Sequence, residues 1–164
     1  MKTLEGLAPV VRPDTRLVVL GSFPGVASLQ AQQYYGHPRN HFWPILSALF
    51  GIDLPALPYP DRLDAVLARG VGIWDVYASC RREGSLDSAI EAPRLNDLAS
   101  LRRVAPRLCA VVHNGGESAR SMKHTQALGV DVLRLPSTSP ANASWNFARK
   151  LEAWRAAFER YGVA

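Results

Sequence analysis

The 164-residue sequence has few lysines, few cysteines and no long apolar segment. The only lysines are Lys2, Lys123 and Lys150, all outside the unusual loops described below. We therefore expect no Schiff-base step, which needs a lysine amine. The only cysteines, Cys80 and Cys109, form neither a CxxC pair nor a zinc or iron–sulfur set, so we expect reduced thiols. The sequence predicts no metal and no cofactor.

No apolar segment approaches membrane-spanning length, and residues 1–13 lack the apolar core of a signal peptide. We therefore expect a cytoplasmic protein without a membrane partner. The composition is 48% hydrophobic and 20% charged, which excludes a disordered chain. The length suits one domain with a real core. We expect residues 1–164 to form a single domain and the protein to be a monomer.

The formal net charge is +5, and arginine supplies most of the positive charge. The planar guanidinium group suits phosphate, so one interpretation is a polyanionic partner such as nucleic acid. The other is a basic enzyme with scattered, solvated arginines.

Apolar segments and their boundaries predict the secondary structure. Strands are expected at residues 16–20, 71–77, 108–112 and 130–135. Helices are expected at residues 26–33, 41–50, 62–69, 95–104, 117–128 and 143–161, with Asn40 and Asp61 as N-caps and Gly51 ending the second helix. The stretches at residues 52–60 and 78–94 are expected to be loops. Because strands alternate with helices, we predict a three-layer α/β/α sandwich around a central four-stranded parallel sheet.

Unusual polar loops follow the predicted strands. They are GSFPG at residues 21–25, the loop after Asp75, HNGG at 113–116 and PSTSPANAS at 136–144. Ligands of parallel sheets bind beyond the carboxyl ends of the strands, so these loops should surround one site. The stretch at residues 20–43 also combines turn-forming, aromatic and amide residues. That mixture suits a planar polar group such as a nucleobase.

Five segments in this order resemble the uracil-DNA glycosylase superfamily, and most closely its deoxyinosine (hypoxanthine) glycosylase branch, which is related to the mismatch-specific uracil-DNA glycosylases. The segments are GSFPG at 21–25, YYGHPRNHFWPIL at 34–46, WDVYASCRREGSLDSAI at 74–90, HNGG at 113–116 and PSTSPANAS at 136–144. The resemblance implies a monofunctional DNA glycosylase of base excision repair. Such an enzyme flips a deaminated base out of DNA and hydrolyses its glycosidic bond, with hypoxanthine favoured and mismatched uracil next.

The first of these segments departs from the superfamily pattern at Phe23. Mismatch-specific relatives carry Asn at this position and other members carry Asp, and both help to position the attacking water. A phenyl ring cannot position a water molecule, so another residue must hold the water. The resemblance to the deoxyinosine branch implies Asn40 as the first candidate, with Asp75 as the second. Asn40 can also be only a helix cap, and Asp75 and Asp87 only anchors for loop hydrogen bonds.

The resemblance also implies binding roles for the remaining loop residues. The expected substrate-binding residues are Gly21, Ser22, Phe23, Pro24, Gly25, Tyr35 and Asn114. Phe23 and Tyr35 would stack on a flipped base, or else belong to the core. Asn114 would read a base edge, or else only make a turn. His113 is expected to be structural.

The segment at residues 136–144 matches the superfamily loop that presses into the DNA minor groove. The expected DNA-binding residues are Arg39, His41, Ser137, Thr138, Ser139 and Asn142, and Arg81 and Arg82 are further candidates for phosphate contacts. Asn142 is alternatively the N-cap of the last helix.

Two other functions remain open at this point. Phe23 would also fit a non-catalytic binder of damaged or abasic DNA. Ser22 after a strand suggests a serine hydrolase, but its context is G-S-F-P-G rather than G-x-S-x-G, and no base is tied to it.

Overall fold

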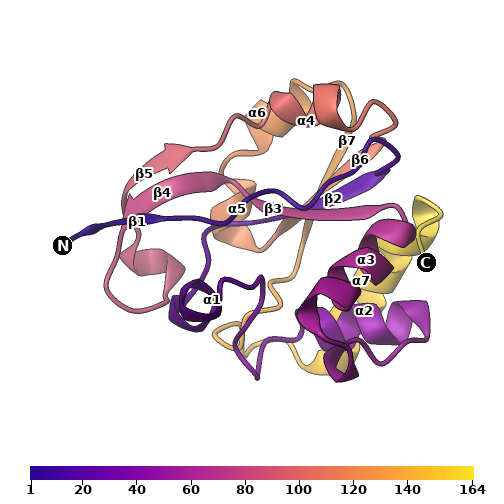
Figure 1. Ribbon diagram of the computed structural model, residues 1–164, viewed down its shortest axis with the longest axis horizontal. Coiled ribbons are helices and arrows are strands. Elements are labelled where there is room, and N and C mark those ends of the chain that lie inside the picture. The colour runs from indigo at the N-terminus through magenta and orange to yellow at the C-terminus, as the bar shows by residue number, and fades with distance from the viewer.

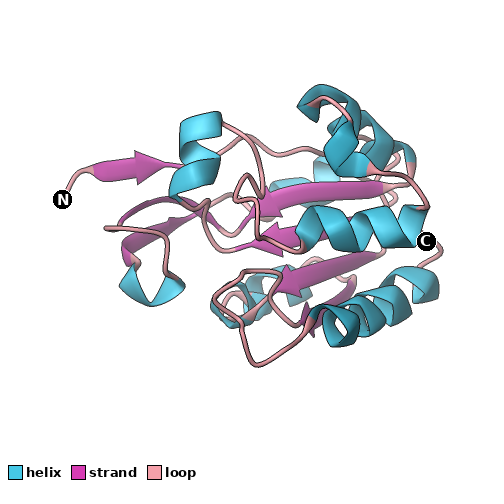
Figure 2. Cartoon of the chain, turned by 90° about the horizontal axis from the view of Figure 1, so that it is seen from below, coloured by secondary structure: helices cyan, strands magenta, loops and turns pink.

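The computed structural model describes all residues 1–164, and its centre is a four-stranded parallel sheet. The strands are β2 (Leu17–Gly21), β3 (Val71–Asp75), β6 (Ala110–Asn114) and β7 (Asp131–Leu135), in the order β3-β2-β6-β7. Every pairing between them is parallel. Helices cover both faces of this sheet (Figures 1 and 2), which confirms the predicted three-layer architecture.

The two faces of the sheet pack into separate apolar cores. Leu17 and Val19 of β2 belong to one core, and Val18 and Leu20 belong to the other, as the alternation of a strand requires. The first core is covered by α2 (Phe42–Phe50), α3 (Tyr59–Ala68) and α7 (Phe147–Arg160). The opposite face carries α4 (Ser100–Val104), α5 (Gly116–Ala119) and α6 (Met122–Gln126), as Figure 1 shows.

A second sheet, which the sequence did not predict, projects from the end where the N-terminus lies (Figure 1). Its antiparallel strands are β1 (Thr3–Glu5), β4 (Tyr77–Arg81) and β5 (Glu91–Leu95). The expectation of a loop at residues 78–94 is therefore wrong for both of its ends. All five residues of β5 are exposed, so it has no apolar alternation to detect, and its structure comes from pairing with β4.

Several helix boundaries differ from the predicted ones. The chain enters α3 at Tyr59 with Pro60 in the first turn, so Asp61 is not its cap. The helix expected over residues 117–128 is broken between α5 and α6. Asn146 caps α7 by accepting from the Arg149 amide, so Asn142 does not cap it. The short α1 spans Val26–Ala31, and 3₁₀ turns occupy Leu54–Ala56 and Asp87–Ala89. No helix has the length and apolar character to cross a membrane.

The register of the parallel sheet brings distant residues to one edge. Gly21 lies directly opposite Asp75, and Asn114 lies directly opposite Leu135, at the carboxyl ends of their strands. The loops that follow these residues therefore meet at this edge, as predicted.

Candidate active site

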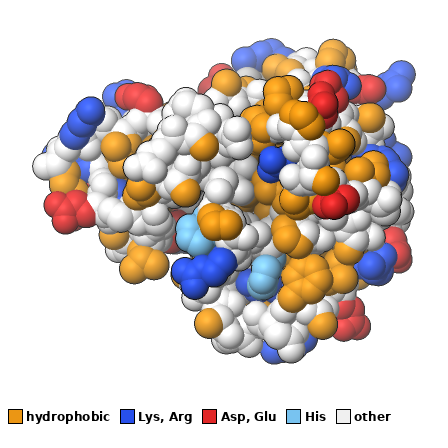
Figure 3. Space-filling view, turned by 60° about the horizontal axis from the view of Figure 1, so that its bottom comes forward, with side chains coloured by type: hydrophobic (Ala, Val, Ile, Leu, Met, Phe, Trp, Pro, Cys, Tyr) orange, Lys and Arg blue, Asp and Glu red, His pale blue; other side chains and the backbone are white.

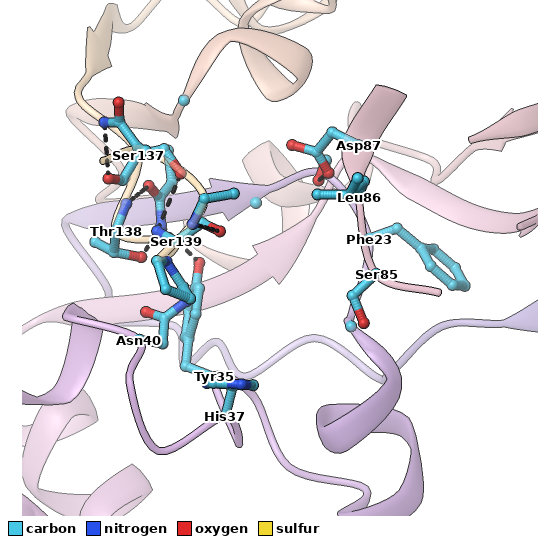
Figure 4. A pocket seen from close by; sticks show the side chains of 18 of the residues that line it. Phe23, Tyr35, His37, Asn40, Ser85, Leu86, Asp87, Ser137, Thr138 and Ser139 are labelled. Atoms are coloured by element: carbon cyan, nitrogen blue, oxygen red, sulfur yellow. Dashed lines mark hydrogen bonds between the residues drawn. The ribbon is translucent and has the colours of Figure 1, made fainter. Parts of the chain in front are cut away.

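A cavity of about 1090 Å³ lies at the carboxyl ends of the parallel strands (Figure 4). Thirteen of the predicted site residues line it: Gly21, Ser22, Phe23, Pro24, Gly25, Tyr35, Asn40, Asp75, Asn114, Ser137, Thr138, Ser139 and Asn142. The structure thus brings together residues that lie up to 121 positions apart in the chain. Arg39 and His41 line a neighbouring cavity instead.

The loop at residues 21–25 is held by the loop that follows β4. The Ser22 hydroxyl donates to Asp87 Oδ1 at 2.6 Å, and the Val26 amide donates to Ser85 Oγ at 2.9 Å. Arg82 donates to the Pro24 carbonyl at 2.6 Å and to the Gly84 carbonyl at 2.8 Å. These bonds connect the two loops into one wall of the cavity.

The Phe23 ring does not face the centre of the cavity. Figure 4 shows it pointing away from Tyr35 and Asn40, and it packs in the second core. The Arg82 guanidinium lies over this ring, 5.4 Å from its centroid. Of the two alternatives for Phe23, the structure therefore agrees with a ring in the core and not with a ring that stacks on a base. Arg82 is buried as well, so it is not available as a phosphate contact.

Asp75 lies at the floor of the cavity and is only 5% exposed. Its Oδ2 atom is buried without a hydrogen-bond partner. A Cβ atom on Gly21 would lie 2.5 Å from Asp75 Oδ1, so only glycine leaves room for this carboxyl. Burial, reinforced by the charge of Asp87 and opposed by that of Arg82, raises the pKa of Asp75 to about 7.

Tyr35 forms another part of the cavity wall. Its ring stacks on Phe42 with centroids 3.9 Å apart and planes 20° apart. Its hydroxyl accepts a hydrogen bond from Asn114 Nδ2 at 3.2 Å. One face of the ring is therefore covered by the core, and burial raises the pKa of the phenol, so it stays neutral.

Asn114 and Thr138 fasten the loop at residues 136–144 to the sheet. The Thr138 amide donates to Asn114 Oδ1, and Asn114 Nδ2 donates to Thr138 Oγ1, both at 3.0 Å. The Thr138 carbonyl accepts from the His41 amide at 2.9 Å. Thr138 is only 1% exposed, so its hydroxyl is not presented to phosphate as expected. Both donors of the Asn114 amide are also occupied, which leaves one oxygen lone pair for a base.

Asn40 borders both cavities. The N-cap of α2 is His41, so the expectation that Asn40 caps the helix is wrong. Asn40 Oδ1 still accepts from the Phe42 amide, the first of the helix, at 2.9 Å. Its Nδ2 makes no hydrogen bond within the chain. The same side chain can therefore fix the helix start and still offer two donors to a water molecule.

The second cavity, about 390 Å³ in volume, carries positive charge without a carboxylate. Its lining includes Arg39, His41 and Lys150, and no Asp or Glu. Lys150 is 1% exposed, donates to Ser139 O at 3.3 Å and lies 3.3 Å from His41 Nδ1. Burial and the charge of Lys150 lower the pKa of His41. Histidine and basic side chains also gather beside apolar ones on the face shown in Figure 3.

Comparisons with known proteins agree with this geometry. A family model described as the uracil DNA glycosylase superfamily matches residues 8–158. The chain belongs to the uracil DNA glycosylase superfamily. It is 37% identical, over 95% of its length and 98% of the relative's, to a hypoxanthine DNA glycosylase of Methanosarcina barkeri. It is 33% identical, over 94% and 97% of the two chains, to a protein of the same name from Methanosarcina acetivorans.

A solved structure supports the same assignment. A solution NMR structure of a candidate uracil DNA glycosylase from Methanosarcina acetivorans is 32% identical to this chain, with a TM-score of 0.87. The match covers 98% of this chain and 99% of that one. The protein is therefore a DNA glycosylase, and its substrate is DNA.

The serine hydrolase interpretation finds no support in this glycosylase. The Ser22 hydroxyl donates to a carboxylate, Asp87, and no histidine accepts from it. His113 Nδ1 bonds Ser118 Oγ and His113 Nε2 bonds Thr125 Oγ1, each at 2.8 Å and inside the protein. Burial lowers the pKa of His113 to about 4, so the ring is neutral, and its position agrees with the structural role expected for it.

Asp87 was expected only as an anchor for loop hydrogen bonds, and its bond to Ser22 agrees with that role. It also lines the main cavity near Asp75, and burial raises its pKa. Lys150 is the residue of the glycosylase site that the sequence did not indicate. Lys150 lies on the amphipathic last helix, 109 residues from His41, and only the packing of α7 brings the two together.

Proposed function

We propose that this DNA glycosylase excises deaminated bases, with hypoxanthine preferred and mismatched uracil next. It flips the damaged nucleotide out of the helix and hydrolyses the glycosidic bond as part of base excision repair, with residues 1–164 acting as one glycosylase domain. The observation that carries this proposal is the cavity at the sheet edge, where a buried carboxyl, an amide with free donors and a neutral phenol meet. Two relatives named hypoxanthine DNA glycosylases support the choice of base.

Asn40 is proposed to orient the attacking water through its Nδ2 donors and the second lone pair of Oδ1. Glycosidic cleavage develops positive charge on the sugar, so a positioned water can attack without a strong general base. Asp75 is proposed to stabilise the reacting groups from the cavity floor. Tyr35, Asn114 and the backbone of residues 21–25 are proposed to hold the base.

The second cavity is proposed to receive a backbone phosphate of DNA. Arg39 and Lys150 supply positive charge there, His41 adds a ring nitrogen, and no carboxylate of the lining neutralises the charge. A bound phosphate would compensate the buried ammonium group of Lys150 and would raise the pKa of His41. Ser137, Ser139 and Asn142 line the main cavity, Asn142 lines the second cavity as well, and all three are proposed to contact the sugar-phosphate backbone.

Duplex oligonucleotides with a single deoxyinosine or deoxyuridine test the proposed activity. Incubation with excess enzyme should release the base and leave an alkali-labile site, faster for deoxyinosine. If neither oligonucleotide becomes alkali-labile, the proposed substrate range is wrong. The alternative, a non-catalytic binder of damaged DNA, is motivated by the apolar Phe23 and predicts tight, salt-dependent binding without base release.

Two replacements of Asn40 distinguish its contact with the Phe42 amide from its proposed contact with water. Asn40→Ala should reduce single-turnover base release far more than DNA binding. Asn40→Ser keeps an acceptor for the Phe42 amide, but its shorter side chain cannot reach a water as far into the cavity. It should therefore be more stable than Asn40→Ala and release the base just as slowly. Equal rates for the wild type and Asn40→Ser would remove Asn40 from the role of water holder.

A further inference from the structure

The carboxyl of Asp75 is placed as an acid rather than as an ion-pair partner. It lies at the end of β3, next to Gly21 across the sheet, and it lines the main cavity. No arginine, lysine or histidine forms an ion pair with it, and its buried Oδ2 has no donor to accept from. An ionised carboxylate in this position would lack compensation, so burial favours the protonated form.

The groups that face Asp75 also favour the protonated form. Asp87, on the loop after β4, adds negative charge, and the neutral phenols of Tyr34 and Tyr35 add none. Arg82 is the one cation that acts on it, but its guanidinium is bound to two backbone carbonyls and covers Phe23. Since Oδ2 is fully buried, Oδ1, the atom next to Gly21, is the oxygen from which a proton could pass to a ligand in the cavity.

We propose that Asp75 is the general acid that protonates N7 of a departing hypoxanthine. This inference rests on the proposed function and gives Asp75 a role that depends on the leaving group. A purine has a lone pair on its five-membered ring at N7, and a proton there lets the base leave as a neutral molecule. The uracil ring has carbon atoms on the corresponding side, so uracil leaves as an anion whose charge is spread over its carbonyl groups. Asp75 should therefore matter for purines and little for pyrimidines.

The proposed step balances without any further reactant. The C1′–N9 bond breaks and its electron pair goes to the base, while the proton of Asp75 passes from Oδ1 to N7. The carboxylate that remains attracts the positively charged sugar. Water then adds its oxygen to C1′, and the proton that it loses returns to Asp75. The products are hypoxanthine and an abasic site, and the acid is regenerated for the next turnover.

Three oligonucleotide substrates test this role under single-turnover conditions: deoxyinosine, its 7-deaza analogue and deoxyuridine. Asp75→Asn should slow release from deoxyinosine roughly 100-fold or more, in the range of general acid catalysis. It should change release from deoxyuridine little. The 7-deaza analogue lacks the proposed acceptor, so the wild type should be slow on it and Asp75→Asn should be no slower. Asp14→Asn, in an exposed turn, is the control for the lost carboxylate.

The pH dependence of base release distinguishes a general acid from a residue with only a structural role. The wild-type rate on deoxyinosine should fall above about pH 7, as Asp75 loses its proton. Asp87→Asn removes a neighbouring negative charge, so this fall should move to lower pH while Asp75 itself stays in place. This variant also tests the proposal if Asp75→Asn does not fold.

Several results would overturn the assignment. Equal slowing of deoxyinosine and its 7-deaza analogue by Asp75→Asn would exclude proton transfer to N7, and so would an unchanged pH profile in Asp87→Asn. A wild-type protein that releases no hypoxanthine at all refutes the proposed function together with this inference. Release of hypoxanthine at the same rate by Asp75→Asn refutes the general acid alone.

Discussion

The buried carboxyl of Asp75 should make the protein less stable as the pH rises. Its pKa is about 7 in the folded chain and near its ordinary value of 3.8 in the unfolded chain. Between these values the unfolded chain has released the proton and the folded chain still holds it, so stability falls with rising pH. At about 1.4 kcal/mol per pKa unit, the full loss above pH 7 is about 4 kcal/mol. Replacement by Asn removes the loss, because an amide does not ionise.

Urea unfolding of the wild type and Asp75→Asn at pH 4.5 and pH 8 measures this effect. The stability of Asp75→Asn relative to the wild type should rise by about 3 kcal/mol between these two pH values. Any pH-independent cost of the amide cancels in this difference. Asp14→Asn corrects for the loss of one carboxylate from the unfolded chain. A relative change of less than about 1 kcal/mol would show that Asp75 is ionised in the folded protein, and the reasoning about its burial would be wrong.

Three further substitutions test other contacts of the site. Gly21→Ala would place a Cβ 2.5 Å from Asp75 Oδ1, so it should abolish most base release while far-ultraviolet circular dichroism stays close to that of the wild type. Asn114→Ala removes both bonds to Thr138 and leaves a buried amide unpaired, so urea unfolding should show a loss of about 2–3 kcal/mol. Lys150→Met should reduce the slope of log Kd against log salt for DNA binding by about 1, whereas Lys123→Met on α6 should not. An unchanged slope in Lys150→Met would exclude phosphate from the second cavity.

The parallel sheet and most of its helices could be predicted because burial leaves a pattern in the sequence. The strands β2, β3 and β6 are buried along their whole length and contain apolar segments, and α7 repeats apolar residues such as Phe147, Leu151, Trp154 and Phe158 on one face. The second sheet could not be predicted in this way. The strand β5 is exposed throughout and contains Pro93, so only its backbone pairing with β4 makes it a strand.

The location of the site was predictable, but the direction of its side chains was not. Parallel strands end at one edge, so Gly21, Asp75 and Asn114 had to lie near one another. Whether a ring faces the cavity or the core depends on partners that are distant in sequence. Arg82 and the second core hold Phe23 away from the cavity.

The hydrogen-bond partners within the site could not be predicted from the sequence either. Asn114 was expected to contact the substrate and Thr138 the DNA, yet the two residues bond mainly to each other. The resemblance to the superfamily identified the segments that surround the cavity. It could not show which polar atoms the fold itself uses, because this depends on distances between loops 24 residues apart.

One competition assay tests the central claim, excision of hypoxanthine by this glycosylase, most directly. Equal amounts of duplexes with deoxyinosine and with deoxyuridine opposite guanine are incubated with excess enzyme, and the free bases are separated by liquid chromatography. Free hypoxanthine should appear first, uracil later, and both should be delayed in Asn40→Ala. Uracil alone, or no free base from duplexes that the protein binds, would contradict the proposed function.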